Sequence, residues 1–216
     1  MFTIQCDFDE TITIGDLGTA IVDAFGSKLW LKSERDYLNG KISVEETSRI
    51  QYRLVDINPE QLEQFVAKSV VIRPGFVEFE RYCHGRNLSL VIVSSGLDLY
   101  IKPTLKMLNL SNIECYTATG KYKNQGIEIS YLDPSGTPIQ EGFKEVYLKY
   151  LREKNLPIIY IGDSMSDIEP AKAADYIFAR GKLEIKLEDE GINFWAFNTF
   201  YDVIEKIDEL LKINDL

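Results

Sequence analysis

Two aspartates set two residues apart directly follow the first apolar run of the chain. Residues 2–6 fit a short buried β-strand that ends as Asp7 arrives, and Asp9 follows after one residue. In an open α/β sheet, ligands bind at the carboxyl ends of the strands. Two carboxylates held close together repel unless a cation or a proton lies between them. For this stretch alone, a turn or a helix cap explains the two aspartates equally well.

Two further apolar runs also end in polar residues. Residues 88–93 are nearly all apolar, which is typical of a central parallel strand, and residues 157–162 form another such run. The polar residues at their ends are Ser94, Ser95 and Gly96 after the first run, and Asp163 and Asp167 after the second. Taken singly, a Ser-Ser-Gly turn and a helix-capping aspartate are more often structural than catalytic.

A lysine adds a positive charge to this set. The apolar spacing predicts a helix over residues 141–154, with Lys144 near its beginning. A cation in the first turn opposes the helix dipole, so its placement there needs a reason, although Lys144 by itself is typical of a solvated surface.

Together, the three strand ends and the lysine predict one crevice suited to phosphoryl transfer. Clustered carboxylates are a hard-oxygen site that suits Mg²⁺, while Ser94 and Lys144 can donate to phosphate oxygens. A divalent cation, positive groups around the phosphoryl oxygens and an in-line nucleophile are what this reaction needs. A carboxylate can itself be the nucleophile.

The remaining elements predict an α/β fold with an inserted helical cap. Strands alternate with helices over residues 74–216, which indicates a mostly parallel sheet with helices on both faces. Between the first strand and this region the patterns are helical. We therefore expect a core made of residues 1–14 and 75–216, and a helical cap over residues 15–74.

Composition limits the classes of partner and the compartment. The 216 residues include 34 acidic and 24 basic side chains, a net charge of −10 that opposes non-specific attraction to nucleic acid or anionic membrane. No apolar run approaches the roughly 20 residues of a membrane span, and the chain begins directly with a strand pattern. We expect a cytoplasmic protein whose three separated cysteines are reduced.

Four segments resemble the motifs of the haloacid dehalogenase superfamily. They are Asp7-Phe8-Asp9-Glu10-Thr11, Val91-Ile92-Val93-Ser94, Lys144 and Gly162-Asp163-Ser164-Met165-Ser166-Asp167. The resemblance covers essentially the whole chain and implies a Rossmann-like core. The helical insert after the first motif looks like the small cap of the phosphoserine-phosphatase branch. By this likeness the roles are a nucleophile, Asp7; a general acid and base, Asp9; phosphoryl-oxygen ligands, Ser94 and Lys144; and Mg²⁺ ligands, Asp7, the Asp9 carbonyl and Asp163, supported by Asp167.

Within that branch, the sequence resembles two kinds of phosphatase. Residues 161–180 and 73–76 look most like the methionine-salvage enzymes that dephosphorylate 2-hydroxy-3-keto-5-methylthiopentenyl 1-phosphate. Residues 40–49 resemble the cap of phosphoserine phosphatases, where an arginine holds the substrate carboxylate. Arg49 is either that arginine or a solvated helix residue. Asp16, most simply a helix N-cap, stands where that family has a cap glutamate.

These likenesses rank the expected activities. Ser166 replaces an asparagine of the phosphoserine phosphatases, so we expect a Mg²⁺-dependent phosphomonoesterase with a methionine-salvage-like substrate, and phosphoserine second. The residues expected to contact the substrate are Asp16, Arg49, Ser95 and Gly96. The same residues would also suit a phosphomutase, or a non-catalytic protein that binds a phosphate ligand or a partner.

Overall fold

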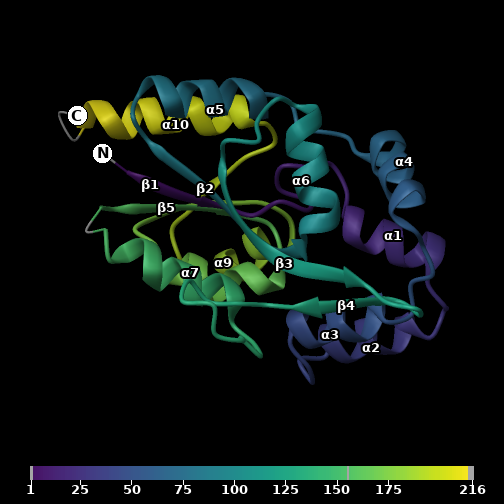
Figure 1. The fold of residues 1–216 in the computed structure, drawn as a ribbon. Helices are drawn as coiled ribbons and strands as arrows, with labels where there is room; N and C mark the ends of the chain where they lie inside the picture. Colours follow the sequence, from purple (N-terminus) through teal and green to yellow (C-terminus); the bar gives the residue numbers. More distant parts are fainter. Residues whose placement is uncertain (1, 155, 214–216) are drawn as a thin grey trace.

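A seven-stranded sheet forms the centre of the fold in the computed structural model, which describes residues 2–154 and 156–213 (Figure 1). Its strand order is β4-β3-β2-β1-β5-β6-β7, and neighbouring strands are parallel except for β3 and β4. The strands are β1 (Thr3–Cys6), β2 (Ser89–Leu97), β3 (Glu114–Tyr122), β4 (Ile127–Ser130), β5 (Ile158–Gly162), β6 (Tyr176–Ala179) and β7 (Trp195–Ala196). The prediction of a mostly parallel α/β sheet is therefore confirmed.

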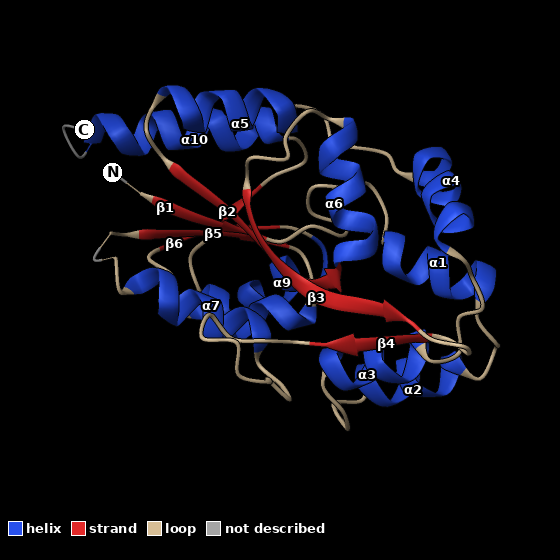
Figure 2. Cartoon of the chain, viewed as in Figure 1, coloured by secondary structure: helices blue, strands red, loops and turns tan. Residues whose placement is uncertain are grey.

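Helices cover both faces of this sheet (Figure 2). Helices α5 and α10 pack together on one face, and α7 and α9 lie on the other. The core helices are α5 (Phe76–Gly85), α6 (Asp98–Met107), α7 (Phe143–Arg152), α8 (Ile168–Lys172), α9 (Gly181–Asp189) and α10 (Phe200–Ile213), with a 3₁₀ turn, η1 (Met165–Asp167). In α7, for example, Phe143, Tyr147 and Leu151 recur every four residues and form one buried face.

The order of the strands creates a ligand-binding edge beside β1. All residues of β1 and β5 are buried, as expected for central strands that are covered on both faces. The chain runs from β1 to β2 and β3 on one side, and then returns to β5, β6 and β7 on the other. Connections that diverge from neighbouring strands leave a crevice at their carboxyl ends, so the β1–β5 boundary is the expected binding position.

Four of the five described helices between β1 and β2 lie beside this carboxyl edge (Figure 1). They are α1 (Leu17–Phe25), α2 (Trp30–Leu38), α3 (Val44–Tyr52) and α4 (Pro59–Ser69). Asp16 accepts a hydrogen bond from Thr19 N at 2.7 Å, so the predicted N-cap of the first helix is present. Helix α3 packs on β4 and α4 packs on α6. The sequence pattern does not predict helix α2, because charges interrupt its apolar residues.

Two strands are longer than the sequence indicates. The Ser-Ser-Gly turn signal predicts that the second strand ends at Ser94, but β2 continues to Leu97 through a shift in register. It remains a strand because Leu97 pairs with Ala118 of β3. Residues 113–116 indicate only a short third strand with an extended hairpin or flap after it, whereas β3 extends to Tyr122 and turns back into the antiparallel β4. None of the described helices has the length and apolarity needed to cross a membrane.

Candidate active site

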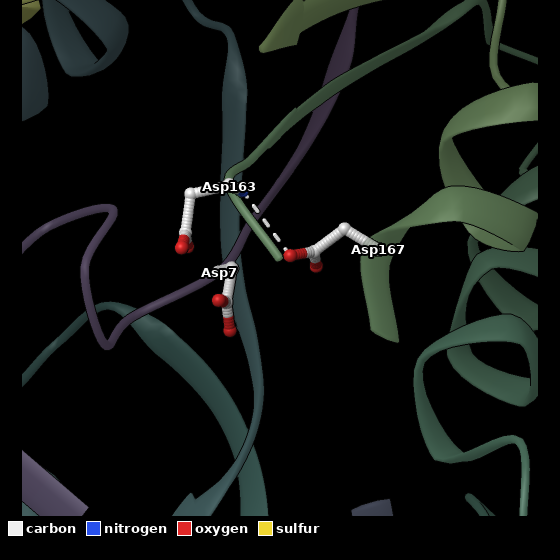
Figure 3. A group of neighbouring side chains, drawn as sticks. All are labelled: Asp7, Asp163 and Asp167. Carbon is white, nitrogen blue, oxygen red and sulfur yellow. Dashed lines mark hydrogen bonds between the residues drawn. The ribbon is translucent and has the colours of Figure 1, made fainter. Parts of the chain in front are cut away.

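Strand register brings the predicted carboxylates together. Cys6 is paired with Ile92 on one side and with Ile161 on the other, so the next residue of the chain, Asp7, lies level with the polar ends of both neighbouring strands. Figure 3 shows the Asp7 and Asp163 carboxylates side by side, with Asp167 approaching from the following helical turn. One oxygen from each of these three buried aspartates lies within 4.8 Å of the others.

Lys144 joins two of these aspartates in a buried ion triad. Its Nζ lies 2.8 Å from Asp7 Oδ1 and 2.7 Å from Asp167 Oδ1, and only 3% of its side chain is exposed. Burial by itself would lower the pKa of Lys144, but the charges of Asp167 and Asp7 outweigh it and hold this pKa above its ordinary value. Lys144 is therefore a fixed cation, which answers why a lysine occupies the first turn of α7.

Both carboxylate oxygens of Asp167 accept hydrogen bonds, and this fixed carboxylate holds Lys144 in place. Besides Lys144, its Oδ1 accepts a hydrogen bond from Tyr160 Oη at 2.5 Å. Its Oδ2 accepts from Ser164 Oγ at 2.7 Å and from the backbone N–H groups of Ser164 and Asp163. Burial raises the pKa of Asp167, but Lys144 and these hydrogen bonds lower it below its ordinary value. The sequence pattern gives Tyr160 no role, since it is one residue of an apolar run among several.

Asp7 and Asp163 have the chemistry of magnesium ligands. Asp7 Oδ1 contacts Lys144, and Asp163 Oδ1 accepts a hydrogen bond from Thr11 Oγ1 at 2.7 Å. Burial, opposed by Lys144 and reinforced by Asp167, raises the pKa of Asp7 to about 7, and burial with the charges of Asp167 and Asp7 raises that of Asp163. Crowded carboxylates with raised pKa values favour a divalent cation, and oxygen donors suit Mg²⁺.

We expect Mg²⁺ binding to release protons below neutral pH. With the pKa of Asp7 at about 7, its carboxyl holds a proton in the metal-free protein below that pH and must lose it to bind the ion. Binding should therefore release about one proton or more per ion near pH 6, with less release and higher affinity as the pH rises through 7. Calorimetric titration in buffers of different ionisation enthalpy measures this number. Equal affinity for Mg²⁺ below and above pH 7, with no proton release on binding, would contradict the prediction.

Asp9 lies apart from the ion triad and in a different electrostatic environment. Its Oδ1 accepts a hydrogen bond from Leu17 N at 2.9 Å and its Oδ2 one from Tyr100 Oη at 2.6 Å. Burial, followed by the charge of Asp16, raises the pKa of Asp9 well above its ordinary value. A protonated carboxyl that faces a reaction site can act as a general acid. Gly96 permits this arrangement, because a Cβ there would lie 2.0 Å from Tyr100 Oη.

Two arginines fix the loop between Asp9 and α1. Arg73 donates to the carbonyls of Glu10 and Thr11, both at 2.6 Å, and to that of Thr13 at 3.0 Å. Arg180 also donates to the Glu10 carbonyl, at 2.6 Å. Glu10 has a positive φ of 55°, and its side chain is exposed. The sequence pattern gives neither arginine a role, because contacts across 60 or more residues leave no local signal.

A small cavity of about 130 Å³ is lined by residues at the strand ends and by residues of α1, α2 and α3. Most of the candidate residues line it: Asp7, Asp9, Asp16, Ser94, Ser95, Gly96, Lys144 and Asp163. Ser94 Oγ accepts a hydrogen bond from Gly96 N at 3.1 Å. Ser95 is 8% exposed, and its Oγ has no hydrogen-bond partner within the described part of the chain.

Arg49 does not line this cavity in the described structure. Its guanidinium donates to the carbonyls of Ile139 and Gln140, at 2.7 and 3.0 Å, and lies 5.2 Å above the ring centroid of Tyr131. It is thus neither a solvated helix arginine nor placed against the cavity. It ties α3 to the segment that precedes α7.

Comparison with known proteins identifies the class that this fold and site define. Residues 4–172 match the haloacid dehalogenase-like hydrolases, and the chain belongs to that family. Curated relatives include two enzymes named 2-hydroxy-3-keto-5-methylthiopentenyl-1-phosphate phosphatase. The one from Brevibacillus brevis is 32% identical, covering 95% of this chain and 94% of the relative. The one from Bacillus mycoides is 29% identical, covering 97% of each. The predicted family and phosphatase class are confirmed.

Solved structures support the same fold. A phosphoserine phosphatase determined as a phospho-aspartyl intermediate analogue superposes with a TM-score of 0.71 at 16% identity, over 94% of this chain and 97% of that one. A substrate-bound phosphoserine phosphatase complex gives a TM-score of 0.69, also at 16% identity and with the same coverage. At this level of identity the likeness concerns the fold.

Proposed function

We propose that this protein is a Mg²⁺-dependent phosphomonoester hydrolase that works through an aspartyl-phosphate on Asp7. The observation that carries the proposal is the contrast between two carboxyl groups at the same cavity. Asp7 is paired with the fixed cation Lys144, whereas Asp9 is half-buried and has no cationic partner among the described residues, and its pKa is raised. Two titratable groups whose environments separate their pKa values are the expected pair of nucleophile and acid.

In the first half-reaction, an oxygen of Asp7 attacks phosphorus while the bond from phosphorus to the ester oxygen breaks. Asp9 gives its proton to that leaving oxygen. Lys144 and the hydroxyl of Ser94 hold the phosphoryl oxygens as negative charge moves onto them. Mg²⁺, held by Asp7, the Asp9 carbonyl and Asp163, would neutralise part of the phosphoryl charge.

In the second half-reaction, water attacks the phosphorus of the aspartyl-phosphate. Asp9, now ionised, removes a proton from that water and is ready for the next cycle. The bond between phosphorus and the Asp7 oxygen breaks, and inorganic phosphate leaves. Asp167 keeps Lys144 in position throughout, because its own oxygens are occupied by donors.

Asp9→Asn should lower kcat in a way that depends on the leaving group. The amide can keep both contacts, by accepting from Leu17 N and donating to Tyr100 Oη, so the fold should persist. Loss of the proton donor should lower kcat by roughly 10²- to 10⁴-fold for an alkyl phosphate, and much less for p-nitrophenyl phosphate, whose leaving group needs no proton. Phosphate release from both esters measures this, and Asp23→Asn, exposed on α1, is the control. An equal loss on both esters would remove Asp9 from this role.

For the substrate, the cavity supports a small ester without a carboxylate. Its volume of about 130 Å³ lies below the range of roughly 300–1,000 Å³ that is typical of sites for drug-sized ligands. Among the described lining residues, Lys144 is the only cation, and the cap side presents the carboxylates of Asp16 and Glu34 with hydroxyl groups such as that of Ser48. A carboxylated substrate would face like charge there, whereas hydroxyl and keto groups would find hydrogen-bond partners.

We therefore propose a substrate like 2-hydroxy-3-keto-5-methylthiopentenyl 1-phosphate in the cytoplasm, ahead of phosphoserine. The test is phosphate release from both esters with Mg²⁺, with p-nitrophenyl phosphate as the reference. The expected result is a kcat/KM at least about tenfold higher for the keto ester than for phosphoserine. A preference for phosphoserine would reverse the ranking. No turnover of any phosphomonoester would favour a phosphate-binding protein, and phosphoryl return to an acceptor would indicate a mutase.

A further inference from the structure

The helix that carries Lys144 is capped by a residue from another part of the chain. Helix α7 follows Gly142, which has no side chain with which to cap it. The carboxylate of Glu45, on α3, accepts a hydrogen bond from Phe143 N at 2.9 Å, across 98 residues of sequence. Glu45 is 3% exposed. A carboxylate at this position satisfies an otherwise unpaired amide of the helix N-terminus and interacts favourably with the helix dipole.

Arg49 extends this contact one helical turn further along α3. Residues four apart lie on the same face of a helix, so Glu45 and Arg49 both face the core. Arg49 donates to the carbonyls of Ile139 and Gln140, while Glu45 accepts from Phe143. We call these contacts of Glu45 and Arg49 with residues 139–143 the clasp. The clasp holds the segment that leads into α7 by both its carbonyl and its amide groups.

The position of Glu45 also compensates for the unusual position of Lys144. Lys144 directly follows Phe143, so its charge lies in the first turn of α7, where the helix dipole opposes it. The negative charge of Glu45 at the same helix end offsets that effect. Glu45 is not among the described residues that line the cavity at Asp7 and Asp9, although it lines an adjoining one with Lys144 and Ser95; its hydrogen bond is to the α7 backbone.

We propose that Glu45 is a positioning residue that acts through the N-terminus of α7 to hold Lys144 against Asp7. Docking of α3 on the core then determines the geometry of the phosphoryl site, and the cap contributes to catalysis without touching the reacting atoms. The part of this proposal that concerns turnover rests on the proposed function, because it assigns Lys144 to the phosphoryl oxygens.

Two substitutions of Glu45 separate its charge from its hydrogen bond. Glu45→Gln has nearly the same shape and keeps an acceptor for Phe143 N but loses the charge, whereas Glu45→Ala loses both. Glu60→Gln is the matched control, since Glu60 is also the second residue of a cap helix and is exposed. If Glu45→Ala does not fold, the same measurements are made on Glu45→Gln. Arg49→Met then tests the contacts of Arg49 in the clasp.

Amide hydrogen exchange tests the capping without reference to activity. In Glu45→Ala, exchange at Phe143 and in the first turn of α7 should accelerate by roughly threefold to thirtyfold, the range expected for loss of a helix cap. Glu45→Gln should show a smaller change, and Glu60→Gln should match the wild type. Unchanged exchange at Phe143 in Glu45→Ala would overturn the proposal.

Kinetics and phosphate affinity then test the link to Lys144. With p-nitrophenyl phosphate and Mg²⁺, Glu45→Ala should lower kcat by roughly tenfold to a hundredfold, as displacement of a catalytic group does, and change KM much less. Affinity for inorganic phosphate should weaken in parallel. Faster exchange at Phe143 with kcat and phosphate affinity both as in the wild type would overturn the proposal. If the wild type hydrolyses no ester, the proposed function fails, and the affinity for inorganic phosphate then tests the positioning role. A weaker affinity in Glu45→Ala than in the wild type would support that role, and an unchanged affinity would overturn it.

Discussion

Asp7→Asn should lose hydrolysis of every phosphomonoester, by a factor on the order of 10⁴ or more, while its fold is retained. An amide nitrogen or oxygen at this position does not attack phosphorus, so the covalent step is removed outright. The fold should persist because asparagine has the same shape, and its carbonyl oxygen can still accept from Lys144 Nζ, now 2.8 Å from Asp7 Oδ1. Phosphate release with Mg²⁺ and p-nitrophenyl phosphate, together with thermal unfolding, measures both parts.

The control for this substitution is Asp23→Asn. Asp23 pairs with Lys28 on the surface of α1, away from the site, so that variant should hydrolyse esters at the wild-type rate. Undiminished turnover by Asp7→Asn would refute the aspartyl-phosphate mechanism. Loss of turnover together with loss of the folded state would leave the nucleophile to be tested by trapping the phosphorylated aspartate in the wild type.

Lys144→Met should lower both stability and activity, because it leaves two buried carboxylates without their cation. Removing one partner of a buried ion pair typically costs about 3–5 kcal/mol of unfolding free energy. Here the cation serves Asp7 and Asp167 together, and both are nearly inaccessible to solvent. Turnover should also fall sharply, since the charge next to the phosphoryl oxygens is lost. Urea unfolding of the metal-free protein and phosphate release measure the two effects.

Lys149→Met is the matched control, since Lys149 lies on the same helix and is exposed. It should unfold at nearly the wild-type urea concentration and keep its activity. If Lys144→Met were as stable as the control, the triad would contribute little to folding. If it were also as active, Lys144 would have no part in holding phosphate.

These predictions depend on the different roles of carboxyl groups that lie close together in the site. Asp167 is held ionised by Lys144, Tyr160 and Ser164, whereas burial keeps the pKa values of Asp7 and Asp9 high. Lys144 lowers the pKa of Asp7 relative to what burial alone would give, and Asp9 has no such neighbour among its main influences. The same residue type therefore supplies a nucleophile, a proton donor and a support for the lysine.

The sequence alone determined the class of fold and the residues at the strand ends. Apolar runs that stop at Asp7, Ser94 and Asp163 are local signals, because a central strand must be apolar and its carboxyl end must be polar to bind a ligand. The N-cap at Asp16 and the helix around Lys144 are local in the same way. Such features depend on neighbours within a few residues, so a linear pattern is enough to find them.

Only the tertiary structure decided how these residues are supported. The contacts of Tyr100 with Asp9, of Arg73 with the loop after it, and of Glu45 with Phe143 join residues that are 60 to 98 positions apart. Arg49 illustrates the same limit. From the sequence, Arg49 could be a substrate ligand or a solvated helix residue, whereas in the fold it belongs to the clasp. Hydrogen bonds that close over such distances depend on how helices and strands pack, and packing leaves no periodic trace in the chain.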